Sequence, residues 1–394
     1  MHYSPYDPDV QHNPFPYYRW MRDEAPVYHN DEVGFWALTR FDDVISASMD
    51  ANRFVSGMGM TIEGLDVAEG NDILINKDDP AHNWHRRLVS RVFTPMAVAG
   101  QADTIRQIAR RMIERVRGEG RMDVIQDLAL ALPVEVICEM LGIPASKRGG
   151  IHQCSSRMLT MAADDGRPFV SDDARDAQLT LGMTMYEIVA ERAAAPADDI
   201  ISLLLASEVT DDGGDTWSLT TEQVTSRVTE LVIAGHETTA KLIGNMVVAL
   251  AWFPDERAKL VADPSLIPRA VEEGLRWDGP SHYQGRWVHE PVTLHDVTIP
   301  AESRVILVTG AASHDDREFE HPELFSVERE ITRNVALGWG AHLCIGQALA
   351  RLEARVVFEE LLAVVPEWEL ADGAVRAGSG QVRGHEHLPI EFAV

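Results

Sequence analysis

Cys344 stands in a glycine-rich loop, residues 337–346, directly before a segment with strong helical periodicity. Gly338, Gly340 and Gly346 bracket it, and glycines let a backbone approach a flat ligand closely or turn with positive φ. At a helix start, free N–H groups and the positive end of the dipole favour a thiolate over a thiol. The pattern therefore indicates a metal ligand or a nucleophile. Judged alone, a lone cysteine is more often a packed core residue.

Glu237 and Thr238 form an acid–alcohol pair in the middle of the longest predicted helix, about residues 221–253. The carboxyl group can relay protons, and a hydroxyl freed from its bond to the preceding turn can donate one. Glycine and threonine are poor helix formers, so a local irregularity is expected here. His236 does not complete a zinc-protease helix, because position 240 is alanine instead of a second histidine.

Cationic side chains that could hold an anion occur in separate parts of the sequence. His82 and Arg86 are four residues apart, so on a helix both can point to the same anion. Arg286 and His342 come much later in the chain. Each of these residues, taken alone, is more commonly a solvated charge.

The loop around Cys344, Leu-Gly-Trp-Gly-Ala-His-Leu-Cys-Ile-Gly, resembles the haem-ligand loop of the cytochrome P450 family, Phe-Gly-x-Gly-x-His-x-Cys-x-Gly. Leu337 departs from the pattern, which usually has phenylalanine there. The resemblance implies haem b as cofactor, with the Cys344 thiolate as iron ligand and Gly338 and Gly346 beside it. It also implies that His342 contacts a haem propionate.

Other segments match the family in the same order along the chain, so the resemblance covers nearly all of it. Glu273 and Arg276 match Glu-x-x-Arg, a buried pair in relatives, and Arg329 is the candidate third member. Residues 79–87 resemble the segment of soluble bacterial relatives whose histidine and arginine grip a propionate. The matching positions are His82 and Arg86, and Arg286 lies where relatives place another propionate arginine.

The resemblance implies a haem-thiolate monooxygenase that activates dioxygen and oxidises a small organic substrate. Thr238 would then hydrogen-bond the dioxygen, and Glu237 would relay protons to it. One alternative is a peroxide-driven haem-thiolate oxidase or peroxygenase, against which this pair argues because peroxide-specialised relatives tend to lack it. The other alternative is a non-enzymatic haem-binding protein.

Electrons are expected from a separate protein, since no nicotinamide or flavin site is recognisable. The Gly338-x-Gly340 pair has leucine at position 343 and no surrounding βαβ unit. Relatives of this soluble type use a ferredoxin-type electron donor with its reductase. Five residues are the candidates for a basic docking patch: His85, Arg87, Arg91, Arg351 and Arg355.

The substrate pocket is assigned by position in the resemblance alone. Its candidates are Met58, Met60, Leu231, Ala234, Gly235, Thr238, His282, Tyr283 and Gln284. The methionines suit an adaptable apolar wall. The polar residues around His282 favour a substrate with some hydrogen-bonding groups, such as an oxygenated natural product.

The sequence has 35 Lys and Arg against 62 Asp and Glu, a formal net charge of -27. Such a surface repels phosphate and anionic lipid, so neither nucleic acid nor a membrane is an expected partner. Three cysteines, at 138, 154 and 344, form no disulfide framework, which favours a reducing cytoplasm. We expect a monomer.

The predicted elements give a mainly α fold with small β-sheets, one large domain over residues 1–394. Residues 26–40 predict a hairpin and 291–309 short strands. Apolar residues recur at helical spacing in several segments: 101–117, 124–141, 178–193, 268–277 and the segment from Cys344 to 365. For the long central helix, Thr220 and Gln223 predict a capping box and Pro254 a stop.

Overall fold

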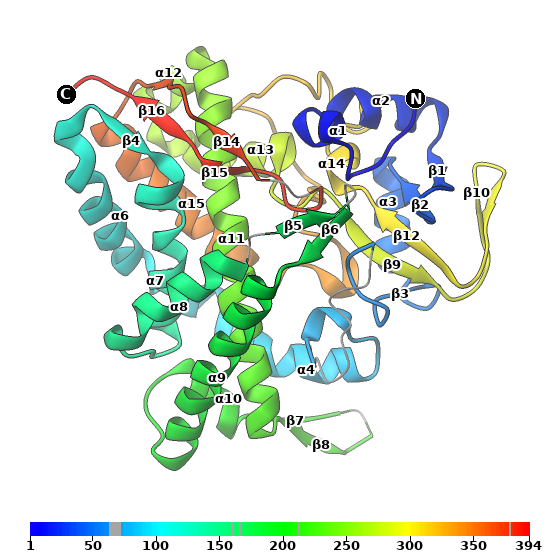
Figure 1. Ribbon diagram of the computed structural model, residues 1–394, viewed down its shortest axis with the longest axis horizontal. Coiled ribbons are helices and arrows are strands. Elements are labelled where there is room, and N and C mark those ends of the chain that lie inside the picture. The colour runs from blue at the N-terminus through cyan, green and yellow to red at the C-terminus, as the bar shows by residue number, and fades with distance from the viewer. Residues whose placement is uncertain (63–71, 159–160, 165–166, 212, 378–379) are drawn as a thin grey trace.

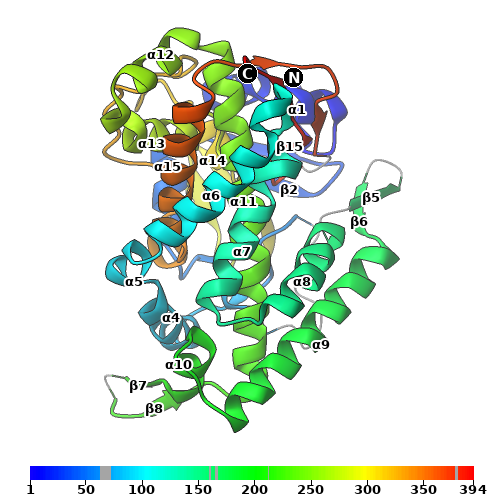
Figure 2. The same ribbon diagram turned by 90° about the vertical axis from the view of Figure 1, so that its left-hand side faces the viewer.

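One long helix, α11 (Thr221–Trp252), passes through the middle of the molecule, and most other helices pack around it (Figures 1 and 2). The computed structural model describes residues 1–62, 72–158, 161–164, 167–211, 213–377 and 380–394. The other α-helices are α1 Pro8–His12, α2 Phe15–Glu24, α3 Phe41–Met49, α4 Ala81–Ser90, α5 Pro95–Ala99, α6 Ala102–Val116, α7 Ala131–Met140, α8 Ala145–Met158, α9 Asp172–Ala194, α10 Ile200–Ala206, α12 Pro254–Ala262, α13 Ile267–Asp278, α14 Thr309–Ala312 and α15 Gln347–Val364. The strands are β1 Val27–Asn30, β2 Phe35–Leu38, β3 Phe54–Val55, β4 Arg121–Asp123, β5 Met161–Asp164, β6 Arg167–Val170, β7 Glu208–Thr210, β8 Thr216–Ser218, β9 Gln284–Val288, β10 Val292–Leu294, β11 Val297–Ile299, β12 Ser303–Leu307, β13 Glu369–Leu370, β14 Val375–Arg376, β15 His385–His387 and β16 Pro389–Glu391.

α11 begins and ends where the sequence predicts. The Thr220 hydroxyl accepts the backbone N–H of Gln223, and the Gln223 side chain accepts the backbone N–H of Thr220. The prediction of a local irregularity near Gly235 is wrong, because α11 is a continuous α-helix. Every residue from 239 to 250 is buried, so packing on all sides holds the part of α11 that follows this point.

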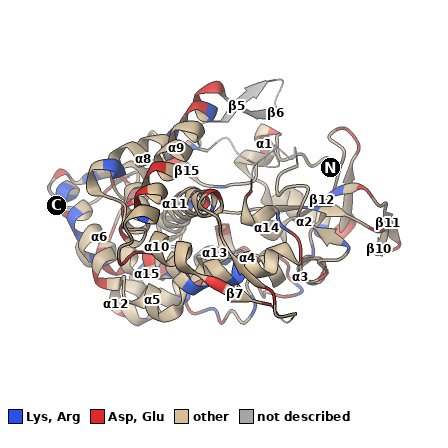
Figure 3. Cartoon of the chain, turned by 90° about the horizontal axis from the view of Figure 1, so that it is seen from below, with Lys and Arg blue, Asp and Glu red and all other residues tan. Residues whose placement is uncertain are grey.

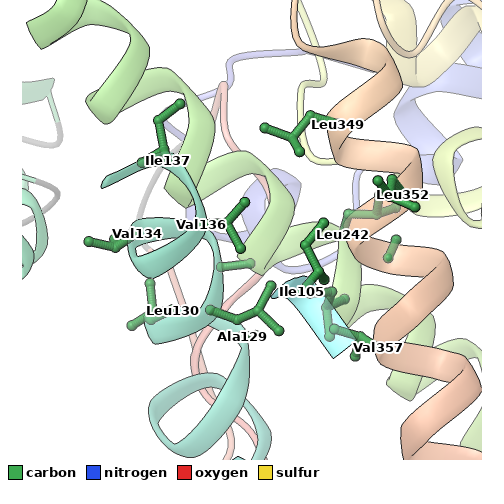
Figure 4. Packing of buried hydrophobic residues seen from close by; sticks show 14 of the residues in the cluster. Ile105, Ala129, Leu130, Val134, Val136, Ile137, Leu242, Leu349, Leu352 and Val357 are labelled. Atoms are coloured by element: carbon green, nitrogen blue, oxygen red, sulfur yellow. The ribbon is translucent and has the colours of Figure 1, made fainter. Parts of the chain in front are cut away.

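The largest core cluster joins the helices that carry the candidate site. Figure 4 shows Ile105 of α6, Val136 of α7, Leu242 of α11 and Leu352 of α15, all of which are buried. Close-packed side chains of this kind hold neighbouring helices in one arrangement. The core therefore fixes α15, which begins just after Cys344, relative to α11.

A sheet made from distant parts of the chain lies beside the helical region (Figure 1). Its strand order is β1-β2-β12-β9-β3. β1 and β2 form the predicted antiparallel hairpin, and β12 pairs parallel with β2 and antiparallel with β9. β3 pairs with the other edge of β9. The sheet thereby brings Gln284 and Arg286 of β9 beside residues 54–60, where Gly285 N–H donates to Met60 O at 2.7 Å.

The predicted helical segments are confirmed with shifted ends. The segment 101–117 corresponds to α6, 178–193 lies within α9, and 268–277 lies within α13. The segment 124–141 is divided, because Leu130 N–H bonds to Ile125 O, five residues back, in a π-helical turn before α7. Among the described helices, none is long and apolar enough to cross a membrane.

Candidate active site

The loop before α15 depends on two left-handed glycines. Gly338 and Gly340 have φ of +77° and +70°, conformations that residues with a Cβ rarely adopt. The backbone N–H of Cys344 donates to the carbonyl oxygen of Leu337 at 2.8 Å, which closes the loop. Cys344 is thus held at a defined position directly before α15, as the sequence predicts.

The surroundings of the Cys344 sulfur decide its protonation. Burial raises the pKa of the Cys344 thiol, while the backbone N–H of Gly346, Arg86 and Arg351 lower it. A bound metal cation adds the positive charge that stabilises a buried thiolate. A Cβ placed on Gly346 would meet no atom within 4 Å, so a flat ligand can lie against this side of the loop. By contrast, burial raises the pKa of Cys138 to about 12, which leaves that thiol inert.

Four cationic or imidazole side chains meet near this loop, from three different elements. The rings of His82 on α4 and His342 lie 4.2 Å apart. Arg86, one turn along α4, donates to the carbonyl oxygen of Leu343. Arg286 on β9 is buried. The structure therefore brings the four predicted propionate contacts into one cluster.

The electrostatics of this cluster reflect its burial and the two arginines in it. Burial, with Arg286, His82 and Arg86, lowers the pKa of His342 to about 2. Burial lowers the pKa of Arg286 to about 10, opposed by Asp78. The Nε2 atom of His82 is buried and has no hydrogen-bond partner among the described residues. Buried cations and unpaired donors of this kind fit a dianion, so these residues match the two carboxylates of a haem.

On α11, Thr238 differs from what the sequence indicated. Its hydroxyl donates to the carbonyl oxygen of Ala234 at 2.9 Å and is not freed from the preceding turn. The reason is the unbroken helix, which keeps that carbonyl within reach of a threonine side chain. A Cβ on the neighbouring Gly235 would meet no atom within 4 Å. Burial raises the pKa of Glu237, opposed by Lys241 and reinforced by Glu386.

The Glu273–Arg276 pair is confirmed as a fully buried ion pair. The guanidinium uses Nε and Nη2 on the two Glu273 oxygens, each at 2.7 Å. Its remaining N–H bonds go to three backbone carbonyls between residues 313 and 324. Arg329 Nε donates to Glu273 at 3.1 Å, which confirms it as the third member. This network fixes the polar segment that leads into the Cys344 loop.

The predicted pocket residues divide into two groups. The Gln284 amide lies near Gly338, since a Cβ there would be 3.1 Å from Gln284 Nε2, and the next residue of β9, Gly285, donates its N–H to Met60 O. His282 instead lies in a buried network, with Nδ1 2.9 Å from the Tyr18 hydroxyl and Nε2 3.3 Å from Asp278. Both of its ring nitrogens are therefore engaged by protein groups.

The remaining pocket candidates are placed as follows. Tyr283 packs in the buried cluster under the N-terminal segment. Met58 is exposed, Leu231 is buried, and Ala234 is exposed on α11.

The predicted basic patch is smaller than the sequence indicated. His85 is buried against the Trp84 ring, and Arg351 and Arg355 pair with Glu272 and Glu359. Arg87 and Arg91 are exposed and form no ion pair with any described residue. Figure 3 shows acidic and basic segments interspersed over this view of the molecule. Burial removes His85 from the candidates, a pair within α15 engages Arg355, and a pair with α13 engages Arg351.

Sequence reasoning missed residues that act through tertiary contacts. Ser56 lies 3.0 Å from His342 Nε2, and the carboxylate of Asp78 accepts the backbone N–H groups of Ser56 and Gly57. Lys241 is buried next to Glu237 on α11. A lysine inside an apolar helical run was a signal for Lys241, whereas Ser56 and Asp78 had none.

Comparison with known proteins agrees with this geometry. A family model described as cytochrome P450 matches residues 175–364. The putative cytochrome P450 123 of Mycobacterium tuberculosis is 36% identical over 392 residues, covering 98% of this chain and 96% of that protein. The chain belongs to the cytochrome P450 family. The vitamin D(3) 25-hydroxylase of Pseudonocardia autotrophica is 37% identical over 388 residues, covering 96% of this chain and 93% of that protein.

Solved cytochrome P450 structures share the whole fold. CYP109Q5 from Chondromyces apiculatus superposes with a TM-score of 0.89 at 31% identity, covering 99% of this chain and 98% of that one. CYP109E1 from Bacillus megaterium in complex with testosterone gives 0.85 at 30% identity, covering 97% and 100%. The mainly α fold is therefore confirmed, and the chain is a haem monooxygenase of the cytochrome P450 class.

Proposed function

We propose that this cytochrome P450 takes electrons from a ferredoxin and hydroxylates a largely apolar, sparsely oxygenated substrate of the steroid type. Cys344 is the haem ligand in this proposal, and Glu237 and Thr238 deliver protons. Residues 1–394 act as one domain. The observation that carries the assignment is the group of His82, Arg86, Arg286 and His342, buried or half-buried beside Cys344, in which His82 Nε2 has no hydrogen-bond partner among the described residues.

Bound haem supplies the activation of dioxygen and the transfer of one oxygen atom to the substrate. The protein supplies position and protons. Glu237 holds a proton more readily than an exposed carboxyl group, because burial raises its pKa. The Thr238 hydroxyl gives up only one neutral hydrogen bond to Ala234, worth about 1 kcal/mol, when it turns towards a ligand.

The substrate class rests on relatives and on the pocket residues. CYP109E1 has been solved with testosterone and with corticosterone, and one relative is named a vitamin D(3) 25-hydroxylase. Met58 and Met60 suit an apolar skeleton, and Gln284 offers a hydrogen bond to an oxygen on it. With His282 engaged inside the protein, Gln284 is the polar contact that we assign to the substrate.

The experiment uses haem-loaded protein and three probes: testosterone, corticosterone and vitamin D3. We expect a low- to high-spin shift with at least one probe, and hydroxylated product with a ferredoxin, its reductase and NADH. Absence of both with all three probes would overturn the substrate class. Product with peroxide alone, and none with ferredoxin, would show a peroxide-driven oxidase instead. Haem binding without oxidation of any compound in a wider library would indicate a non-enzymatic haem protein.

The assignment of Cys344 as the haem ligand can be tested against another cysteine of the chain. Cys344→Ser should abolish the thiolate signature in the spectrum of the reduced, carbon monoxide-bound protein. Cys154→Ala, a change of a buried cysteine on α8, should keep that signature. A thiolate spectrum in the Cys344 variant would contradict the assignment.

A further inference from the structure

Glu230 on α11 holds a distant stretch of the chain, residues 72–77. Its two carboxylate oxygens accept the backbone N–H groups of Leu74 and Ile75, at 2.9 and 3.2 Å. These N–H groups begin a 3-10 helical turn, Leu74–Asn76, and the residue before the turn supplies no capping side chain. A carboxylate is a favoured partner for the free N–H groups of a helical start. Glu230 therefore caps this turn from another element.

Two neighbours of Glu230 on α11 add to this attachment. The Ser226 hydroxyl donates to the carbonyl oxygen of Asp72 at 2.5 Å. Arg227, only 1% exposed, lies 3.6 Å from the carboxylates of both Asp72 and Glu230. Its Nε and Nη1 atoms have no hydrogen-bond partner among the described residues, which is unfavourable for a buried guanidinium. The close contacts of the attachment are therefore the hydrogen bonds of Glu230 and Ser226.

The other end of this stretch is fixed to the loop that follows β3. The carboxylate of Asp78 accepts the backbone N–H groups of Ser56 and Gly57, at 2.7 and 2.8 Å. A Cβ on Gly57 would lie 2.8 Å from Asp78 Oδ2, so any other residue here would displace the carboxylate. Residues 72–78 therefore connect α11 with the loop that carries Met58.

The attachment on α11 lies beside candidate pocket residues. Residues four apart on a helix share a face, as Glu230 does with Ala234, and Arg227 with Leu231. Leu74, in the attached turn, is buried in the same core cluster as Leu231. The turn therefore packs onto α11 directly before the pocket candidates of that helix.

We propose that Glu230 is a positioning residue for the substrate: its two hydrogen bonds hold residues 72–77 as a wall of the pocket. This inference rests on the proposed function, which places Leu231, Ala234 and Met58 around the substrate. Glu230 acts through the stretch that it holds. Its loss should therefore change how tightly and how long a ligand is bound, and leave the oxidation step unchanged.

The first measurement is amide hydrogen exchange in haem-loaded protein. The amides of Leu74 and Ile75 should exchange about tenfold faster or more in Glu230→Ala, because each loses a hydrogen bond to a charged group. Glu230→Gln keeps one acceptor oxygen and should lie between wild type and Glu230→Ala. Glu114→Gln, a change of an exposed glutamate on α6, is the matched control without an effect on these amides.

The second measurement uses 4-phenylimidazole, whose ring nitrogen binds the haem iron and whose phenyl group occupies the pocket. Its dissociation rate constant, followed by stopped-flow absorbance, should rise about tenfold in Glu230→Ala and less in Glu230→Gln. Faster exchange at positions 74 and 75 with an unchanged dissociation rate would reduce Glu230 to a structural role and overturn the proposal. Unchanged exchange at both positions would overturn it as well.

A second variant covers the case in which Glu230→Ala does not retain haem. Ser226→Ala removes only the bond to Asp72, so it should also speed dissociation of 4-phenylimidazole, and no increase would overturn the proposal. Where a steroid probe is oxidised, Glu230→Gln should raise KM and leave kcat near wild type; a fall in kcat alone would contradict a positioning role. If wild type binds none of the steroid probes, the proposed substrate class fails, while the 4-phenylimidazole comparison still decides the role of Glu230.

Discussion

The imidazole rings of His82 and His342 lie 4.2 Å apart, inclined at 37°, although one belongs to α4 and the other to the loop before α15. Burial lowers the pKa of both rings, and the arginines near them lower it further. Two neutral imidazoles in contact are tolerable, whereas two imidazolium ions would repel each other. Protonation of these rings should therefore destabilise the protein without haem.

Acid should destabilise haem-free protein through His342. Its pKa is about 2 in the folded protein and about 6.5 in an unfolded chain. Below about pH 6.5 the unfolded chain binds more protons, so the free energy of unfolding falls as the pH decreases. His342→Gln should flatten this decline between about pH 7 and pH 5 in urea denaturation. His321→Gln, which changes an exposed histidine, is the control. If the free energy of unfolding declined equally with acid in wild type, His342→Gln and His321→Gln, the prediction would be contradicted.

Haem binding should itself reduce this sensitivity to acid. Propionate charges beside the cluster favour the protonated rings, which raises the pKa of both histidines relative to the haem-free protein. Denaturation of haem-loaded protein should therefore show a shallower decline with acid than the haem-free form. An identical slope with and without haem would contradict the contact between the propionates and this cluster.

Arg276→Met should destabilise the protein by about 3–5 kcal/mol, because it leaves the fully buried Glu273 carboxylate with one arginine instead of two. All five guanidinium N–H bonds of Arg276 are used, so lysine cannot replace it. The matched control is Arg269→Met, whose exposed pair with Glu330 is worth at most about 1 kcal/mol. If urea denaturation showed the same loss of unfolding free energy in Arg276→Met and Arg269→Met, the prediction would be contradicted.

Thr238→Ala should divert reducing equivalents from product to hydrogen peroxide, since the hydroxyl that assists proton delivery is absent. The expected loss of coupling is about tenfold or more, measured as product formed per NADH consumed. Thr229→Ala is the matched control, because Thr229 lies earlier on α11 and makes the same bond to the preceding turn, at 2.8 Å. Loss of coupling in both variants would indicate a general effect on the helix.

Arg87→Glu should slow reduction by a ferredoxin at low salt, with a smaller difference at high salt, because exposed charges steer association and are screened. Arg175→Glu reverses another exposed arginine, one on α9 that pairs with the exposed Asp172, and should leave the rate unchanged. Stopped-flow reduction across ionic strengths measures both. Arg351→Glu is unsuitable as a test, since it breaks the pair with Glu272.

The sequence predicted what local pattern and motif spacing determine. The α11 capping box, the β1–β2 hairpin and the Glu273–Arg276 pair need only near neighbours or a family motif. Properties set by distant partners could not be predicted. The partner of Arg351 lies on α13, and the bonds of His282 come from α2 and α13, so neither role follows from the neighbouring sequence.

The error at Thr238 has the same origin. The low helix propensity of glycine and threonine indicated an irregular helix, but α11 is continuous here, and a regular helix keeps the Thr238 hydroxyl bonded to Ala234 O. Arg329, predicted as the third member of the Glu273–Arg276 pair, does donate to Glu273.

The separation of Ser56 from His342 by 286 residues has a consequence for biosynthesis. At about 5–20 residues per second, His342 leaves the ribosome about 15–60 s after Ser56. β9 and β12, which complete the sheet around Arg286, also emerge late. A nascent chain therefore carries half of the anion-holding cluster for most of its synthesis. The cluster is complete only once His342 has been synthesised, so we expect haem to bind late in translation or after it.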